Sequence, residues 1–379
     1  MTMATMAMMA DHLIWAIPAF LLVMTTIVFF HELGHYLVGL WCGVKVESFS
    51  IGFGPEIAAF NDKRGTRWRL SAFPLGGYVK FFGDANAASV ADGDAVQGMS
   101  AADRAVSFHG QPVWKRAAIV AAGPIANFIL AIALFAGANM IFGRQVVEPR
   151  VAGVQAGSAA EAAGIRKGDV IVSIDGEAVE SFGDVARIIS SRPETRVEIL
   201  VDRGGVSTQL SAVPTLIEEK TRFGSLRRGR IGIEADSKAS ARTVRYGVGE
   251  SLSMAVSDTW YIVERTGAFM KGLFVGKEDV RQISGVIGMA DMAGTVARVS
   301  FDGLIWLAAV LSVSVGLMNL MPIPLLDGGH LMYYLIEATR GRPLSDRAQE
   351  LGFRFGMMVV VGLMIFSVIN DVTLRLPKF

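Results

Sequence analysis

The chain has 379 residues, of which 52% are hydrophobic and only 19% are charged. Soluble chains carry about 25% charged residues, so this composition predicts a membrane protein with a polar insert. The net charge of +1 removes any general electrostatic case for binding nucleic acid. The single cysteine, Cys42, excludes an intramolecular disulfide bond.

Four apolar segments approach the length of a membrane span, which is about 20 residues. They are residues 13–30, 117–142, 303–326 and 355–370, and the last needs flanking residues to complete a span. No basic segment precedes the first one. We therefore expect it to be a retained span and not a cleaved signal peptide.

A histidine pair directly follows the first apolar segment. Residues 31–35 read His-Glu-Leu-Gly-His, and a helix repeats about every 3.6 residues. His31 and His35 would share one helix face and could hold one zinc ion, with Glu32 placed to activate a bound water. The simpler alternative is a pair of solvent-facing histidines at the polar end of a helix. Ionisable groups beside a span cost about 2.5–3.5 kcal/mol each, which argues for a function.

The next region, residues 44–82, contains two alternating stretches bounded by Gly-Pro and Gly-Gly turns. This pattern predicts paired β-hairpins. Residues 83–112 follow and are rich in Ala, Gly, Asp and Ser. They predict a cytoplasmic linker in which His109 would be a surface histidine.

The second apolar segment lies within an expected span at residues 113–143 and contains Gly123, Pro124 and Asn127. These residues predict a kink packed against a partner helix, because small residues allow helices to approach closely.

From residue 145 to 237 the pattern changes to short β-like segments with glycine turns. Residues 157–169, Gly-Ser-Ala-Ala-Glu-Ala-Ala-Gly-Ile-Arg-Lys-Gly-Asp, resemble a PDZ domain of the circularly permuted bacterial type. The resemblance implies that Ile231, Gly232 and Ile233 form a peptide-binding edge, where a ligand adds as an extra strand. Two alternatives remain: the domain only fills space, or it excludes substrates with bulky outer domains.

Residues 245–300 mix apolar and charged residues, which predicts amphipathic helices at the outer membrane surface.

The third span, expected at residues 301–338, contains Asn-Leu-Met-Pro-Ile-Pro-Leu-Leu-Asp-Gly-Gly-His from Asn319 onward. Its two prolines break the helix inside an apolar segment. Irregular backbone at membrane depth is tolerated only where protein or a wet cavity covers it. Asp327 is therefore a candidate third metal ligand, although alone it could be an ordinary helix end in water.

These two motifs together resemble those of the site-2 protease family of intramembrane zinc metalloproteases. The chain is most similar to the bacterial regulator-of-sigma-E type with a single PDZ domain, over about residues 14–371. The resemblance agrees with His31, His35 and Asp327 as ligands of one Zn²⁺ and with Glu32 as the base. It also implies that residues 44–82 are a membrane-associated β region, whose Gly52 and Gly54 contact an unwound substrate segment.

Two residues depart from the family pattern. Val286 stands where relatives have the proline of a Ser-Gly-Pro segment, and Ser314 stands where many have an asparagine that is thought to bind substrate backbone. We expect either that Asn319 alone supplies that hydrogen bond or that Ser314 supplies it through its hydroxyl.

Basic residues give the orientation. Lys115 and Arg116 precede the second span, and Arg340, Arg342 and Arg347 follow the third. With a fourth span at residues 350–371, the positive-inside rule places these loops in the cytoplasm and residues 144–301 outside it.

The sequence thus predicts an α-helical polytopic membrane protein with about four spans. The first span, residues 12–40, carries the zinc motif, and a β-hairpin region and an inserted extracytoplasmic α+β PDZ domain complete the fold. The expected function is regulated intramembrane proteolysis in a bacterial inner membrane. The expected substrates are pre-trimmed transmembrane helices, such as anti-sigma factors or remnant signal peptides, with peptide C-termini as candidate PDZ ligands. The alternatives are an inactive PDZ scaffold and a metal transporter, although the other spans lack the acidic residues that a transporter needs.

Overall fold

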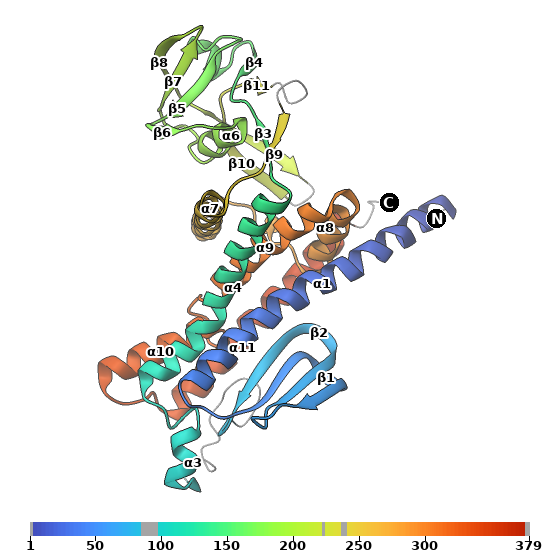
Figure 1. The fold of residues 1–379 in the computed structure, drawn as a ribbon, viewed down its shortest axis with the longest axis vertical. Coiled ribbons are helices and arrows are strands. Elements are labelled where there is room, and N and C mark those ends of the chain that lie inside the picture. Colours follow the sequence, from blue (N-terminus) through green and yellow to red (C-terminus); the bar gives the residue numbers. More distant parts are fainter. Residues whose placement is uncertain (1–2, 85–97, 222–223, 236–240, 376–379) are drawn as a thin grey trace. The chain divides into compact units, whose positions relative to one another are not determined.

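The computed structural model describes residues 3–84, 98–221, 224–235 and 241–375 (Figure 1). The chain divides into two compact units. We call residues 1–138, 249–267 and 284–373 the helical unit, and residues 139–248, 268–283 and 374–379 the sheet unit. Residues 85–97 of the expected linker lie outside the described residues.

Among the described residues, four helices are long and apolar enough to cross a membrane, in agreement with the four predicted spans. The spans are Ile14–Trp41 in helix α1 (Met3–Trp41), Val113–Ile141, which is helix α4, Phe301–Asn319, which is helix α9, and Arg347–Thr373 in helix α11 (Asp346–Arg375). The fourth span is longer than its apolar segment because the flanking polar residues continue the helix.

Small residues let the helices of the helical unit approach closely. A Cβ atom at Gly34 of α1 would overlap the Ala122 carbonyl of α4. One at Gly294 of α8 (Val286–Val299) would lie 2.6 Å from the Ala16 Cα of α1. The apolar residues that these contacts enclose include Phe20, Val23, Ile27, Ala293, Leu304 and Ala308. Such packing is typical of membrane helices, where lipid supplies no hydrophobic drive for association.

Two long antiparallel strands, β1 (Val46–Asn61) and β2 (Arg67–Phe81), form a sheet beside α1 (Figure 1). The first half of β1 pairs with both halves of β2, so that Ser50 faces Tyr78 on one side and Arg69 on the other. Consequently the second half of β2 forms an edge of this sheet.

The described part of the expected linker contains helix α3 (Ala101–Val106), which Ser100 caps. The prediction of a surface histidine at position 109 was wrong. The His109 side chain is only 16% exposed, and its Nε2 atom lies 3.0 Å from the buried Asp84 carboxylate. Sequence reasoning missed this pair because Asp84 lies 25 residues away and its burial comes from tertiary packing.

Helix α7 (Val248–Phe274), a 3₁₀ turn (Val280–Gln282) and helix α10 (Asp327–Arg340) also lie outside the spans. In the helical unit, α8 begins without a side-chain cap of its own. Asp371 of α11 supplies that cap, because its carboxylate accepts hydrogen bonds from the Gly285 and Gly288 amides at 3.2 and 2.8 Å.

The sheet unit centres on a four-stranded antiparallel sheet in the order β6-β5-β7-β8. Three further strand pairs, β12–β3, β11–β4 and β10–β9, accompany it. Its elements are β3 (Arg144–Val147), β4 (Val151–Val154), α5 (Ala159–Ala162), β5 (Val170–Ile174), β6 (Glu177–Ala178), α6 (Phe182–Ser190), β7 (Val197–Arg203), β8 (Val206–Ala212), β9 (Thr215–Thr221), β10 (Gly224–Arg230), β11 (Ile233–Ala235) and β12 (Ala241–Val244). Alternate residues of β7, namely Val197, Ile199 and Val201, are buried in the hydrophobic core of the sheet unit, because successive side chains of a strand point to opposite faces.

A buried ion pair fixes the start of β5. The Asp169 side chain is 1% exposed, and its two oxygens accept hydrogen bonds from the Arg203 guanidinium at 2.8 Å each. These bonds outweigh the effect of burial and lower the pKa of Asp169. Such a carboxylate stabilises the fold above its unfolded pKa, and that stabilisation is lost as the pH falls through the folded pKa.

We therefore expect Asp169→Asn to reduce the free energy of opening of β5 and β7 by about 2 kcal/mol at neutral pH, the value of hydrogen bonds to a charged group. The deficit should shrink as the pH falls below the ordinary pKa of aspartate, because the opened state of the parent then binds a proton at Asp169 and the parent loses stability. Hydrogen exchange at the Ile171 and Ile199 amides measures both effects. A deficit that stays constant down to about pH 3 would contradict this account.

Candidate metal centre

Two imidazoles meet near the C-terminal end of the span in α1. His31 and His35 lie one turn apart, and their Nε2 atoms are 3.3 Å from each other. The side chains are only 11% and 12% exposed. Burial of two ring nitrogens that point at each other is costly unless a third group compensates them.

Asp327 is the first residue of α10, and an irregular loop brings it to the histidines. Helix α9 ends at Asn319, and the prolines at 322 and 324 prevent its continuation. Leu325 adopts φ of +108°, a strained value for a non-glycine residue of the kind that collects at functional sites. A Cβ atom at Gly328 would overlap the Leu320 and Met321 carbonyls. The glycine after Asp327 is therefore required for the loop to fold back over the first turn of α10.

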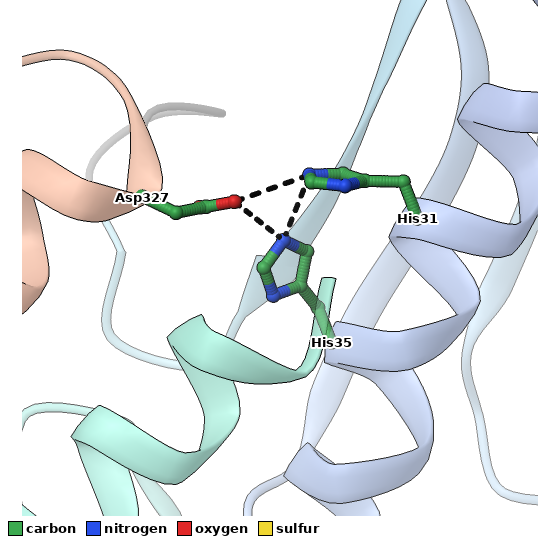
Figure 2. Close-up of side chains that lie close together, drawn as sticks. All are labelled: His31, His35 and Asp327. Atoms are coloured by element: carbon green, nitrogen blue, oxygen red, sulfur yellow. Dashed lines mark hydrogen bonds and ion pairs between the residues drawn. The ribbon is translucent and has the colours of Figure 1, made fainter. Parts of the chain in front are cut away.

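The three ligand atoms form a compact triangle (Figure 2). Asp327 Oδ2 lies 3.2 Å from His31 Nε2 and 3.6 Å from His35 Nε2. In a tetrahedral zinc site with bonds of about 2.0–2.1 Å, ligand atoms lie about 3.3–3.4 Å apart. Apart from these two imidazoles, no described residue donates a hydrogen bond to this buried oxygen. The donor set, the spacing and the lack of any other partner for the carboxylate oxygen all fit a zinc ion.

Helix α4 forms the wall behind the two rings. His35 Nδ1 lies 2.8 Å from the Ile119 carbonyl, which accepts its proton and leaves Nε2 free to bind a metal. One turn on, Gly123 leaves the space that the rings occupy, because a Cβ atom there would overlap His35 Nε2 and lie 2.9 Å from His31 Cε1.

Gly123→Ala is therefore expected to displace the imidazoles and weaken zinc binding by at least about tenfold, as other changes around metal ligands do. Gly137→Ala is the matched control, since it lies on the same helix and its Cβ would meet nothing within 4 Å. Zinc affinity measured by chelator competition decides the prediction. Equal affinities in the two variants would contradict it.

Glu32 is buried on the side of α1 that faces the β1–β2 sheet. Its carboxylate interacts with the Val79 backbone amide in the edge segment of β2. A Cβ atom at Gly77 would lie 3.0 Å from Glu32 Cγ and 2.8 Å from Val28 Cγ1, so this glycine lets the strand approach the helix. The position places a carboxylate between the imidazole pair and a strand edge.

The other predicted contact residues lie in different places. Asn319 is half-buried at the end of α9, and the Ser314 hydroxyl donates to the Val310 carbonyl of its own helix at 3.0 Å. Gly52 and Gly54 have φ of +86° and +88° in β1, where a Cβ atom would meet Phe73 at 2.8 Å in each case. Ile231, Gly232 and Ile233 belong to the sheet unit.

Sequence reasoning did not place α4 at the metal centre. Gly123 and Asn127 were interpreted only as packing residues, yet Asn127 lies 3.2 Å from His31 Nδ1. The available signal was an uncompensated amide inside an apolar segment, four residues after a glycine.

Comparison with known proteins decides the family. The model of peptidase family M50 matches residues 19–363. The chain belongs to peptidase family M50. It is 49% identical over 359 residues to an Agrobacterium fabrum protein named as a zinc metalloprotease, a match that covers 94% of this chain and 95% of that one. It is 40% identical to metalloprotease MmpA of Caulobacter vibrioides, covering 93% and 94% of the two chains.

This M50 protein is thus a multi-pass membrane metalloprotease with zinc as its cofactor. Among solved structures, the PDZ domain of an SdrC-like protein from Listeria monocytogenes matches 24% of this chain and 90% of its own. The sequence identity is 28% and the TM-score is 0.20.

Proposed function

We propose that this M50 metalloprotease cleaves peptide bonds within transmembrane segments, with zinc held by His31, His35 and Asp327. The observation that carries the proposal is the buried triangle of ligand atoms, two of them on a helix long enough to span a membrane. A zinc ion held there supplies Lewis-acid polarisation of the scissile carbonyl and activation of a water molecule.

In this proposal Glu32 is the general base. Its carboxylate takes a proton from the attacking water and later passes it to the leaving amine. Its burial beside the imidazole pair excludes bulk water from that transfer. Glu32 interacts electrostatically with both imidazoles, whereas Asp327 is assigned to the metal.

A substrate helix must unwind before it is cut, because its own hydrogen bonds occupy its amides. The edge segment of β2 lies beside Glu32 and could pair with the unwound substrate as an added strand. We assign Asn319 and Ser314 as donors to the substrate backbone or the developing oxyanion. In the described conformation the Ser314 hydroxyl is engaged by Val310, so Asn319 is the stronger candidate.

We propose pre-trimmed transmembrane helices as substrates, with anti-sigma factors and remnant signal peptides as the classes implied by the family resemblance. The distribution of basic residues supports an inner-membrane topology with the sheet unit outside the cytoplasm.

A groove in the sheet unit supports peptide binding by a PDZ-type domain. A cavity of about 250 Å³ lies between α6 and the segment 228–233, lined by Phe182, Val185 and Ile189 on one side. Gly232 has φ of +82°, and a Cβ atom there would overlap Ser158, so only glycine fits this turn of the groove.

Peptide binding is tested with the full chain and a labelled peptide that ends in a free carboxylate. We expect binding by the parent, loss on amidation of the peptide C-terminus, and loss in Gly232→Ala. Gly204→Ala is the control, because it has φ of +64° and open space around it. Equal affinity for carboxylate and amide peptides would refute recognition of a free C-terminus, and no binding of either peptide would favour a domain that acts only by excluding large substrates.

The proposed activity is tested in liposomes with the full chain and a transmembrane peptide labelled at both ends. We expect cleavage within the apolar segment, its loss with a zinc chelator and its recovery on adding zinc. Cleavage only outside the apolar segment would refute the intramembrane assignment. No cleavage of any transmembrane peptide by zinc-loaded protein would favour the inactive scaffold.

A further inference from the structure

We infer that Asn127 is a positioning residue for the metal centre: its side-chain amide fixes the ring orientation and the tautomer of His31. The inference rests on the proposed zinc site and adds a residue that the two ligand motifs do not contain. Asn127 belongs to α4, 96 residues from His31, and is completely buried.

The tautomer of His31 decides which of its ring nitrogens can bind a metal. A neutral ring carries one proton, so His31 can offer Nε2 to a metal only when Nδ1 holds that proton. A buried Nδ1–H needs an acceptor. His35 has one in the Ile119 carbonyl, at 2.8 Å. The polar group next to His31 Nδ1 is the Asn127 amide, at 3.2 Å.

The Asn127 side-chain amide can act as a hydrogen-bond donor or as an acceptor toward His31. Its Nδ2 faces His31 Nδ1, whereas its Oδ1 is buried and bonds to no described residue. A half-turn about the terminal side-chain bond exchanges these two atoms while the rest of the residue stays in place. Oδ1 then accepts the Nδ1 proton of His31, and Nε2 keeps its lone pair directed at Asp327 and His35. Loading the site with metal selects this orientation.

Neighbouring helices hold Asn127 in place. The Ser312 hydroxyl of α9 donates to the Asn127 backbone carbonyl at 2.8 Å. A Cβ atom at Gly316 of α9 would lie 3.2 Å from Asn127 Cβ, so α9 closes the far side. Ile119, Gly123 and Asn127 follow one another at intervals of four residues and form one stripe of α4. Ile119 orients the His35 ring, Gly123 leaves room for both rings, and Asn127 orients the His31 ring.

The test uses the purified full chain and compares two substitutions. Asn127→Asp keeps an acceptor oxygen beside His31, whereas Asn127→Leu fills a similar volume without one. Loss of an outer partner of a metal ligand typically lowers metal affinity by about 10–100-fold. We expect Leu to weaken zinc binding by this factor, and Asp to remain within about threefold of the parent.

Two readouts separate positioning from packing. The first is zinc affinity by chelator competition, and the second is the visible spectrum of the cobalt-substituted protein, which reports ligand geometry. Asn139→Leu is the control, because Asn139 is a second fully buried asparagine of α4. It lies 12 residues further on, about 18 Å along the helix. We expect it to change neither readout.

The outcomes distinguish this inference from the site itself. Loss of zinc in His31→Ala together with parent-like affinity and spectrum in Asn127→Leu would overturn the role of Asn127 alone. Equal weakening by Asp and Leu would also overturn it, because packing would then explain the effect. Full zinc content in His31→Ala would instead refute the proposed ligands.

Discussion

Replacing Asp327 by alanine is expected to reduce the zinc content from one ion per chain to nearly none and to abolish proteolysis. The substitution removes the only anionic member of the ligand triangle and leaves two imidazoles 3.3 Å apart. Protein zinc sites bind with about 10–16 kcal/mol, so the share of one ligand is about 3–4 kcal/mol, or several hundredfold in affinity. Elemental analysis of protein purified without added metal measures the loss.

Asp302→Ala is the matched control for this variant, since Asp302 lies in the first turn of α9 and belongs to no described metal cluster. It should retain one zinc ion per chain. Stoichiometric zinc in Asp327→Ala would remove Asp327 from the ligand set. Zinc loss in both variants would instead point to a general disturbance of the α9–α10 region.

Glu32→Gln should have the opposite signature, with zinc retained and cleavage reduced by about a thousandfold. Glutamine keeps the shape of the side chain and its contact with the β2 edge, but it cannot accept a proton from water. General acid–base catalysis typically contributes about 10²–10⁴-fold, which sets the expected size of the loss. Single-turnover cleavage of a transmembrane peptide by zinc-loaded protein measures the effect.

Glu47→Gln serves as the control, because Glu47 pairs with Lys80 at 2.9 Å on the partly exposed face of the same sheet. Its cleavage rate should stay near that of the parent. Retained cleavage in Glu32→Gln would exclude Glu32 as the base, while loss of zinc would mean that it supports the metal site directly.

The sequence predicted the helical part of the fold well because membrane spans depend on a local property, the length of an apolar segment. The fourth span was the least certain from hydropathy alone. It became a full span because residues such as Arg347 and Glu350 extend the helix beyond its apolar part. The double pairing of β1 with β2 could not be predicted, since strand register depends on bends and shifts at Gly52 and Gly54.

The candidate site likewise combines features that follow from local sequence with features that depend on distant contacts. The shared face of His31 and His35 follows from helical periodicity, which is local. The approach of Asp327 spans 292 residues of sequence, and its expectation depended on family resemblance as well as on the broken helix. The contacts of Gly77, Gly123 and Asn127 could not be derived from the sequence, because each depends on which atoms of another element lie where a side chain would extend.

X-ray absorption at the zinc edge of the purified full chain tests the proposed ligand set most directly. We predict one zinc ion with two imidazole nitrogens and one carboxylate oxygen at about 2.0–2.2 Å, plus one further light atom in the open position. A sulfur neighbour at about 2.3 Å would implicate Cys42, and a single imidazole would separate His31 from His35. Either result would contradict the metal centre described here.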